Sequence, residues 1–102
     1  MRLGCCAYSY RDKLQSGEMT MLGFLDECVR VGFDGVELTS YYFADADRSE
    51  LLRLKRECFA RGLEVTGTAV GTNLCQSSPD GRAADVRKAR EWMEKGSLLG
   101  AP

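Results

Sequence analysis

Apolar residues gather in three short runs that have the composition of buried β-strands. The runs cover residues 3–8, 35–39 and 64–70, and the third is rich in valine and threonine, which suit a pleated surface. Their starts lie about 30 residues apart, which is the length of one strand–helix–strand unit. The spacing predicts three parallel strands joined by crossover connections.

Between and after these runs, apolar residues recur at the spacing of one helix face and predict helices over residues 21–31, 48–61 and 79–99. Each predicted helix follows a residue whose side chain can cap the first turn, and these residues are Thr20, Asp47 and Ser78. The apolar stripes that we expect to be buried consist of Leu22, Leu25, Cys28, Val29, Leu51, Leu54, Cys58, Phe59, Val86, Ala89 and Met93. The predicted order is βαβαβα, an α/β fold with helices outside a parallel sheet.

The connections between the predicted elements differ in length at the two ends of the sheet. Each of the first two helices returns to the next strand within two or three residues, at 32–34 and 62–63. Each strand leads to its helix through a longer loop, and these loops cover residues 9–19, 40–46 and 71–77. In parallel α/β folds the loops at the carboxyl ends of the strands carry the ligand site. We therefore expect a site built from the three long loops.

Aromatic and neutral polar side chains collect at this predicted end of the sheet. They are Tyr8, Tyr10, Tyr41, Tyr42, Phe43, Asn73 and Gln76. Such a surface suits a polyhydroxylated molecule, because aromatic rings stack on the faces of a sugar while its hydroxyl groups need hydrogen-bond partners. The partner that we expect is a small sugar or polyol.

Charge and composition argue against several other classes of protein. The net charge is -1 with no basic field, so we expect no nucleic-acid partner. No apolar segment approaches the length of a membrane span and no secretory signal is recognisable, so we expect no membrane association. Five cysteines without a signal indicate free thiols in a reducing compartment, which predicts a cytoplasmic location. Histidine is absent, so the usual general base and the commonest metal ligand are missing.

Four segments of the chain have an order and spacing that match one enzyme family. They cover residues 3–10, 32–38 (Gly-Phe-Asp-Gly-Val-Glu-Leu), 67–73 and 99–102. The first three resemble the first strand, the second strand with its approach turn, and the end of the third strand of the sugar-phosphate isomerase/epimerase family, which is xylose-isomerase-like. The fourth resembles the turn that leads into strand four. The resemblance extends over the whole chain.

This resemblance implies a (β/α)8 TIM barrel of roughly 250 residues, of which residues 1–102 would form the first three units. It also implies a divalent metal held by carboxylates and a histidine on later strands, and paired acids that move protons between the carbons of a sugar or polyol. This segment would then contain no catalytic residue and no metal ligand, and would form one wall of the substrate pocket. We expect the isolated chain to be inactive and to bind a divalent ion weakly at most.

Six residues are candidates for substrate binding, and they are Tyr8, Tyr10, Glu37, Tyr41, Thr68 and Asn73. A carboxylate in an apolar strand is costly without a partner, so Glu37 contacts either substrate or a neighbouring strand. The tyrosines either stack on substrate or pack against the barrel rim, and Asn73 either bonds a hydroxyl or its own turn. The adjacent Cys5 and Cys6 are interpreted as small core residues.

Two alternative functions stay open on the sequence. One is another chemistry in the same barrel family, such as that of a dehydratase or an endonuclease-like hydrolase. The sequence lacks a basic stripe, which argues against a nucleic-acid substrate. The other is a non-catalytic α/β module that works by association. Three parallel strands leave two unpaired edges, and such edges recruit partners or a second copy of the chain.

Overall fold

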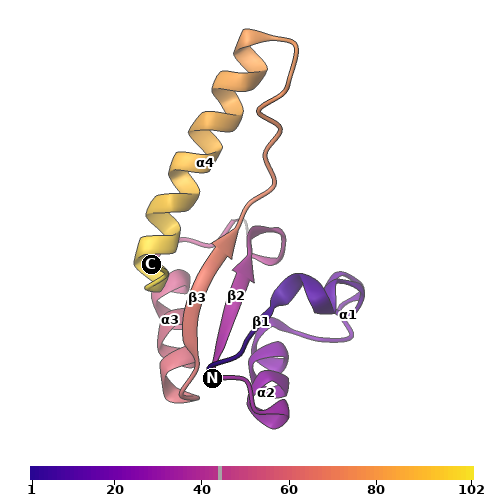
Figure 1. Ribbon diagram of the computed structural model, residues 1–102, viewed down its shortest axis with the longest axis vertical. Coiled ribbons are helices and arrows are strands. Elements are labelled where there is room, and N and C mark those ends of the chain that lie inside the picture. The colour runs from indigo at the N-terminus through magenta and orange to yellow at the C-terminus, as the bar shows by residue number, and fades with distance from the viewer. Residues whose placement is uncertain (44) are drawn as a thin grey trace.

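A computed structural model describes residues 1–43 and 45–102 (Figure 1). Its elements, in chain order, are β1 (Gly4–Cys6), the 3-10 helix η1 (Ala7–Tyr10), α1 (Arg11–Ser16), α2 (Met21–Val31), β2 (Gly35–Thr39), the 3-10 helix η2 (Ser40–Tyr42), α3 (Arg48–Ala60), β3 (Glu64–Ala69) and α4 (Pro79–Leu99). The three strands form one parallel sheet in the order β1-β2-β3. The predicted α/β fold with parallel strands is confirmed. Within the described residues, no helix combines the length and apolarity that crossing a membrane requires.

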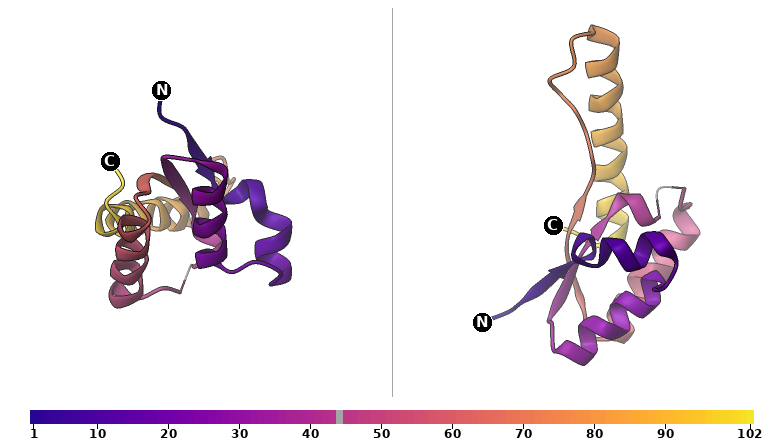
Figure 2. Two further views of the ribbon diagram at one scale, coloured as in Figure 1. Left: turned by 90° about the horizontal axis from the view of Figure 1, so that it is seen from below. Right: turned by 90° about the vertical axis from the view of Figure 1, so that its right-hand side faces the viewer.

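One face of the sheet is covered by α2 and α3, and the two views of Figure 2 place both helices on the same side. Val36 and Leu38 of β2 point into this layer and are completely buried, as are Phe24 and Leu25 of α2. Glu37 lies between the two buried β2 residues and is only partly buried. Because side chains alternate along a strand, Glu37 faces the side of the sheet that these helices do not cover.

The long helix α4 runs beside β3 and α3, and its first half projects beyond the sheet together with the loop that precedes it (Figure 1). Its buried residues, Trp92, Gly96 and Leu99, all lie in the second half. Gly96 allows a close approach to the sheet, since an added Cβ would lie 3.0 Å from Oγ1 of Thr68. The packed end of α4 therefore completes the helical layer next to β3.

Four of the apolar residues expected in buried stripes are exposed, so that part of the prediction is wrong. They are Val29, Phe59, Val86 and Met93, with exposed fractions of 47%, 85%, 40% and 72%. Val86 lies in the first half of α4, which contains none of the buried residues of this helix. In α3 the buried face runs through Leu51, Leu54 and Cys58, and the next residue already points outward.

The start of the chain also differs from the prediction. The first strand was expected over residues 3–8, but it ends at Cys6 and the backbone turns into η1. The following helix, α1, was not predicted, because its six residues are mostly polar and none is buried. It ends at Gly17, whose φ of 78° lies in the left-handed region that glycine adopts most easily. These turns bring Tyr8 and Tyr10 to different sides of the sheet end.

All three predicted caps are present. The side chains of Thr20, Asp47 and Ser78 accept hydrogen bonds from the backbone N–H three residues later, at 3.1, 2.8 and 3.0 Å. Each bond satisfies one of the amides that a first helical turn leaves unpaired. Helices α2, α3 and α4 therefore begin one residue after these caps, where the sequence predicted them to begin.

A β-bulge shifts the register between β2 and β3. Val36 pairs with Val65, but Glu37 pairs with Gly67, so Thr66 is the extra residue. The bulge places Thr66 and Gly67 on the face of Gly35 and Glu37 and turns the next residue of β3 to the opposite face. This irregularity decides which residues of β3 reach the candidate site.

The cysteines differ in burial, and we expect them to differ in reactivity for that reason. Cys28 and Cys58 are buried in α2 and α3, and burial raises the pKa of Cys28 to about 12 and that of Cys58 to about 11. Cys75 is exposed in the loop before α4. Because the thiolate is the nucleophile, we expect iodoacetamide at pH 8 to alkylate Cys75 in the folded chain, and Cys28 and Cys58 only after unfolding. Peptide mass mapping measures this order, and equal labelling of the three thiols in the folded chain would contradict it.

Candidate functional site

A cavity of about 270 Å³ opens at the carboxyl ends of the three strands. Its lining comes from all three strands and the loops that follow them, and consists of Cys6, Tyr8, Glu37, Thr39, Tyr41, Ala69, Val70 and Gly71. We call it the strand-end cavity. Two tyrosine side chains, one carboxylate, one thiol and one threonine hydroxyl surround it, so it offers both apolar surface and hydrogen-bonding groups to a small ligand.

Glu37 is held in the strand-end cavity by its neighbour on β1. The Cys6 thiol donates a hydrogen bond of 2.9 Å to Oε1 of Glu37 and lies 3.7 Å from Oγ1 of Thr39. Burial, and next the bond to the Glu37 carboxylate, raise the pKa of the Cys6 thiol. Within residues 1–43 and 45–102, the second carboxylate oxygen, Oε2, accepts no hydrogen bond from protein. Glu37 thus bonds a residue of the neighbouring strand, as one of the two interpretations predicted, and it also faces the cavity.

Gly67 of β3 keeps the space beside this carboxylate open. It pairs with Glu37 across the bulge, and an added Cβ would have only Cγ of Glu37 at 3.7 Å and Oε2 at 3.9 Å for neighbours. Apart from Glu37 and the chain neighbours of Gly67, none of the described residues has an atom within 4 Å of that Cβ position, so the glycine leaves space beside the carboxylate.

Cys6 was interpreted as a core residue, and that interpretation is wrong. Cys5 is 8% exposed and belongs to the core, whereas Cys6 is partly buried and lines the strand-end cavity. The reason is strand alternation, which sends two adjacent side chains to opposite faces. Since Cys6 pairs with Glu37 in the parallel ladder, its thiol lies beside the carboxylate.

Two tyrosines form the aromatic wall of the cavity. The rings of Tyr8 and Tyr41 meet edge to face with centroids 6.3 Å apart, and the Arg11 guanidinium lies 5.3 Å from the Tyr8 centroid. Tyr8 is 45% exposed and Tyr41 is 55% exposed, so a ligand can reach their rings. The adjacent Tyr42 turns away from the cavity, and burial raises the pKa of its hydroxyl.

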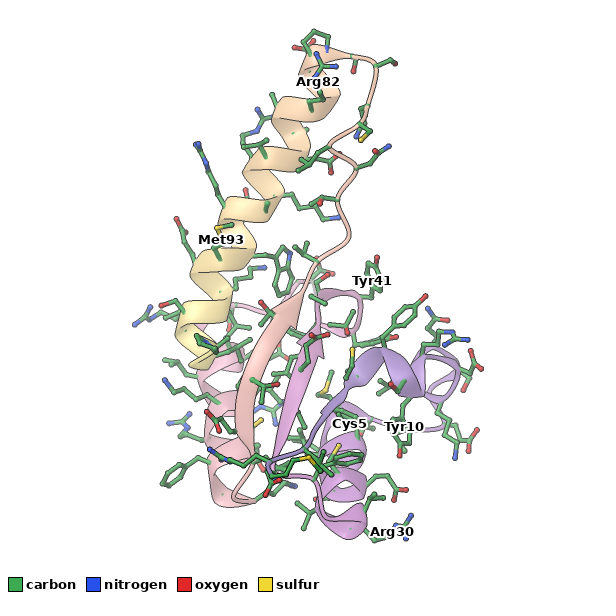
Figure 3. All side chains as sticks on the ribbon, viewed as in Figure 1. Cys5, Tyr10, Arg30, Tyr41, Arg82 and Met93 are labelled. Atoms are coloured by element: carbon green, nitrogen blue, oxygen red, sulfur yellow. The ribbon has the colours of Figure 1, made fainter. Side chains whose placement is uncertain are left out.

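Three of the six candidate residues, Tyr8, Glu37 and Tyr41, therefore meet in one cavity, and the other three lie elsewhere. Tyr10 packs on Phe24 of α2 with ring centroids 5.6 Å apart, and Figure 3 shows it on the helix side while Tyr41 stands at the strand ends. Thr68 faces Gly96 of α4, because the bulge has turned it to the helix side.

Asn73 makes a local bond and does not line the strand-end cavity. Its Oδ1 accepts a hydrogen bond of 3.1 Å from the backbone N–H of Cys75. This is the turn-forming role that asparagine often takes in loops. Besides Cys6, four residues that line the cavity were not among the candidates from the sequence, and they are Thr39, Ala69, Val70 and Gly71. Their positions at the ends of the predicted strands could have indicated them.

A second cavity, of about 260 Å³, lies between the first turns of α2 and α3. Its walls are mostly apolar and include Met21, Leu22, Phe43, Leu51 and Leu54. It is on the helical side of the sheet, away from Glu37. Thr20, Tyr42, Glu50 and Arg53 give this cavity polar groups as well. Ligand sites of parallel α/β folds form at the carboxyl ends of the strands, however, so the strand-end cavity is the better candidate for a sugar.

The residues of the strand-end cavity do not fit a divalent metal. Such an ion takes several oxygen, nitrogen or sulfur ligands, and the cavity offers one carboxylate and one thiol that is bonded to it. Across residues 1–43 and 45–102, no three His, Cys, Asp or Glu side chains come together as a possible metal site.

Comparison with known proteins gives matches among solved structures alone. No family model and no curated protein matches the chain. D-psicose 3-epimerase, crystallised in the presence of D-fructose, superposes with a TM-score of 0.76 at 17% identity, covering 99% of this chain and 35% of the other. D-psicose 3-epimerase from Clostridium cellulolyticum H10, solved with D-tagatose, gives a TM-score of 0.75 at 16% identity, with coverages of 99% and 35%.

A protein from Sinorhizobium meliloti 1021 gives a TM-score of 0.75 at 19% identity, covering 97% of this chain and 33% of the other. The chain thus spans about a third of the length of each of these structures. The TM-scores of 0.75 and 0.76 establish the fold, and identities below 20% restrict the similarity to the fold. This fold agrees with the one that the sequence resemblance implied. The chain therefore has the α/β fold of the first units of a TIM barrel, the fold that it shares with these solved structures.

Proposed function

We propose that this chain is the amino-terminal part of a sugar or polyol isomerase or epimerase, and that the strand-end cavity is one wall of its substrate pocket. The observation that carries the proposal is the Glu37 carboxylate, whose Oε2 accepts no hydrogen bond from the described residues and which lines one cavity together with the accessible rings of Tyr8 and Tyr41. A carboxylate oxygen in such a place is suited to accept a hydrogen bond from a sugar hydroxyl. The similarity in fold to two ketose epimerases supports this choice of ligand.

The described residues would bind and orient the substrate. Oε2 of Glu37 accepts from one hydroxyl, while the rings of Tyr8 and Tyr41 contact an apolar face of the sugar. The Cys6 thiol fixes the Glu37 carboxylate through Oε1, so that the other oxygen is already aimed before the ligand arrives. Proton transfer between sugar carbons needs further acidic groups, which we assign to parts of the barrel outside these 102 residues.

The sugar-binding role is tested by titrating the full chain with D-fructose and following backbone amide resonances. We expect millimolar affinity, with shifts centred on Cys6, Tyr8, Glu37 and Tyr41. Glu37→Gln keeps the size of the side chain but removes its charge, and should weaken binding about tenfold or more, the equivalent of one charged hydrogen bond.

The matched control is Glu64→Gln at the opposite end of the sheet. Glu64 begins β3 and pairs with Arg2 on the surface, at 2.7 Å. This change should leave the affinity for D-fructose within a factor of about two, because an exposed ion pair contributes little. Equal affinity in the wild type and in both variants, or shifts scattered over the helices, would refute the proposed function.

Metal binding and catalysis provide a separate prediction. We expect the 102-residue chain to show no ketose epimerisation and to bind Mn²⁺ only weakly, because the described residues gather no set of ligands. Isothermal titration with Mn²⁺ is the measurement, with EDTA-treated protein as the starting state. Stoichiometric binding with a micromolar or lower dissociation constant would show that this assignment of roles is wrong.

A second candidate function is association through the strand edges. In the described part of the chain, β1 and β3 each pair with β2 alone, so each presents one open edge. Such edges favour pairing with another chain. Sedimentation equilibrium, together with the D-fructose titration, distinguishes the two functions. A dimer that does not bind D-fructose would favour association, and a monomer that binds the sugar would favour the role as a pocket wall.

A further inference from the structure

The position of Tyr41 depends on a glycine in the loop after β3. An added Cβ at Gly71 would collide with the Tyr41 hydroxyl oxygen and would lie 3.1 Å from Cζ and 3.2 Å from Cε1 of the same ring. Real Cβ atoms are rarely found so close to another heavy atom, so any other residue at 71 must displace the ring. Both residues line the strand-end cavity, so a displaced ring changes its shape.

The peptide that contains this glycine is tied to the projecting half of α4. The Lys88 ammonium donates a hydrogen bond of 2.7 Å to the carbonyl oxygen of Gly71. The outer part of the same loop is held by other bonds, from Arg82 to the carbonyl oxygens of Gln76 and Ser77 at 2.6 and 3.0 Å. Lys88 is therefore a contact by which α4 holds the part of the loop that lines the cavity.

We propose that Gly71 and Lys88 are positioning residues for Tyr41, and this rests on the proposed sugar-binding function. Gly71 leaves the space that the Tyr41 hydroxyl occupies, and Lys88 keeps the Gly71 peptide against it. The projecting helix would then set the width of the cavity at its aromatic wall. Figure 3 shows Tyr41 at the point where the loop leaves the sheet toward α4.

The geometry also predicts that an alanine at 71 is tolerated by the fold. The φ angle of Gly71 lies outside the left-handed region, so an L-residue can adopt its backbone conformation. The atoms in the way belong to the end of a side chain that is 55% exposed, and the ring can swing outward without moving the backbone. Gly71→Ala should therefore move Tyr41 while the sheet stays intact.

The experiment compares the full chain with Gly71→Ala and Lys88→Met, each labelled with ¹³C-tyrosine. The Tyr41 ring signal is assigned by its loss in Tyr41→Phe. We expect both variants to shift this signal and to weaken D-fructose binding about 2–10-fold, the equivalent of one aromatic contact. Lys88→Arg retains a donor and should restore the signal and the affinity toward wild type.

Gly23→Ala is the matched control. It adds the same methyl group on α2, where the nearest atoms would be Oγ1 of Thr20 at 3.4 Å and Cγ of Met19 at 3.5 Å. It should leave both readouts unchanged. A Tyr41 signal at its wild-type position in Gly71→Ala and Lys88→Met overturns the inference.

The two proposals fail in different ways. If wild type binds D-fructose and the variants shift Tyr41 without losing affinity, the positioning role in binding is overturned while the sugar function stands. If wild type binds no D-fructose yet Tyr41 shifts in the variants, the sugar function fails and the structural dependence of Tyr41 on Gly71 and Lys88 is supported.

Discussion

Phe24→Ala should lower the free energy of unfolding by about 3–5 kcal/mol. Phe24 is completely buried in α2, belongs to the central core and meets the ring of Tyr10 at a centroid distance of 5.6 Å. Its removal leaves a cavity between α2 and the sheet that the surrounding side chains fill only in part. For a chain of this size the change amounts to a fall of about 15–30 °C in Tm.

Phe59→Ala is the matched control, because the same atoms are removed from a ring that is 85% exposed at the end of α3. It should change the free energy of unfolding by less than about 0.5 kcal/mol. Urea denaturation followed by circular dichroism measures both values. If the two variants lost equal stability, the placement of Phe24 in the core and Phe59 on the surface would be wrong.

Gly35→Ala should cost about 2–3 kcal/mol, the second largest effect that we expect from one substitution. An added Cβ at Gly35 would lie 2.7 Å from the carbonyl oxygen of Glu64 and 2.7 Å from Cγ2 of Thr66. One of these atoms is backbone in the paired strand, so relief requires β2 and β3 to separate. The bulge at Thr66 produces this crowding, because it turns the threonine onto the face of Gly35.

Its control is Gly4→Ala, in the residue of β1 that pairs with Gly35. A Cβ at Gly4 would have no neighbour closer than 3.5 Å, which is ordinary contact. We expect this change to be neutral within about 0.5 kcal/mol. Thermal unfolding measures the stability of the two variants. A Gly35→Ala protein as stable as Gly4→Ala would mean that the register of β2 and β3 is not the one described.

The order of strands and helices could be predicted because each signal is local. The caps at Thr20, Asp47 and Ser78 and the repeat of apolar runs all depend on neighbours in the sequence. The exposure of Phe59 and Met93 could not be predicted in that way. Whether an apolar residue of a helix is buried depends on how far the neighbouring layer extends, and that is a property of the assembled fold.

In the candidate site, too, local features could be predicted and features that depend on strand register could not. Glu37 stood out because a carboxylate in an apolar strand needs a partner, and the structure provides the Cys6 thiol. Simple alternation along β3 would put Thr68 with Thr66 on the cavity side. The bulge adds one residue, so Thr68 turns to α4 and Gly67 takes the place beside Glu37. No local pattern in the sequence marks that extra residue.

We propose that these residues are the first units of a larger sugar isomerase or epimerase barrel, and reading the gene beyond the codon for Pro102 tests this proposal most directly. We predict an open frame that enters an apolar fourth strand and places glutamate, aspartate and histidine at the carboxyl ends of later strands. Those residues would supply the metal and proton-transfer groups beside the strand-end cavity. A stop codon directly after Pro102 would contradict the claim, and the open edges of β1 and β3 would then point to a partner chain.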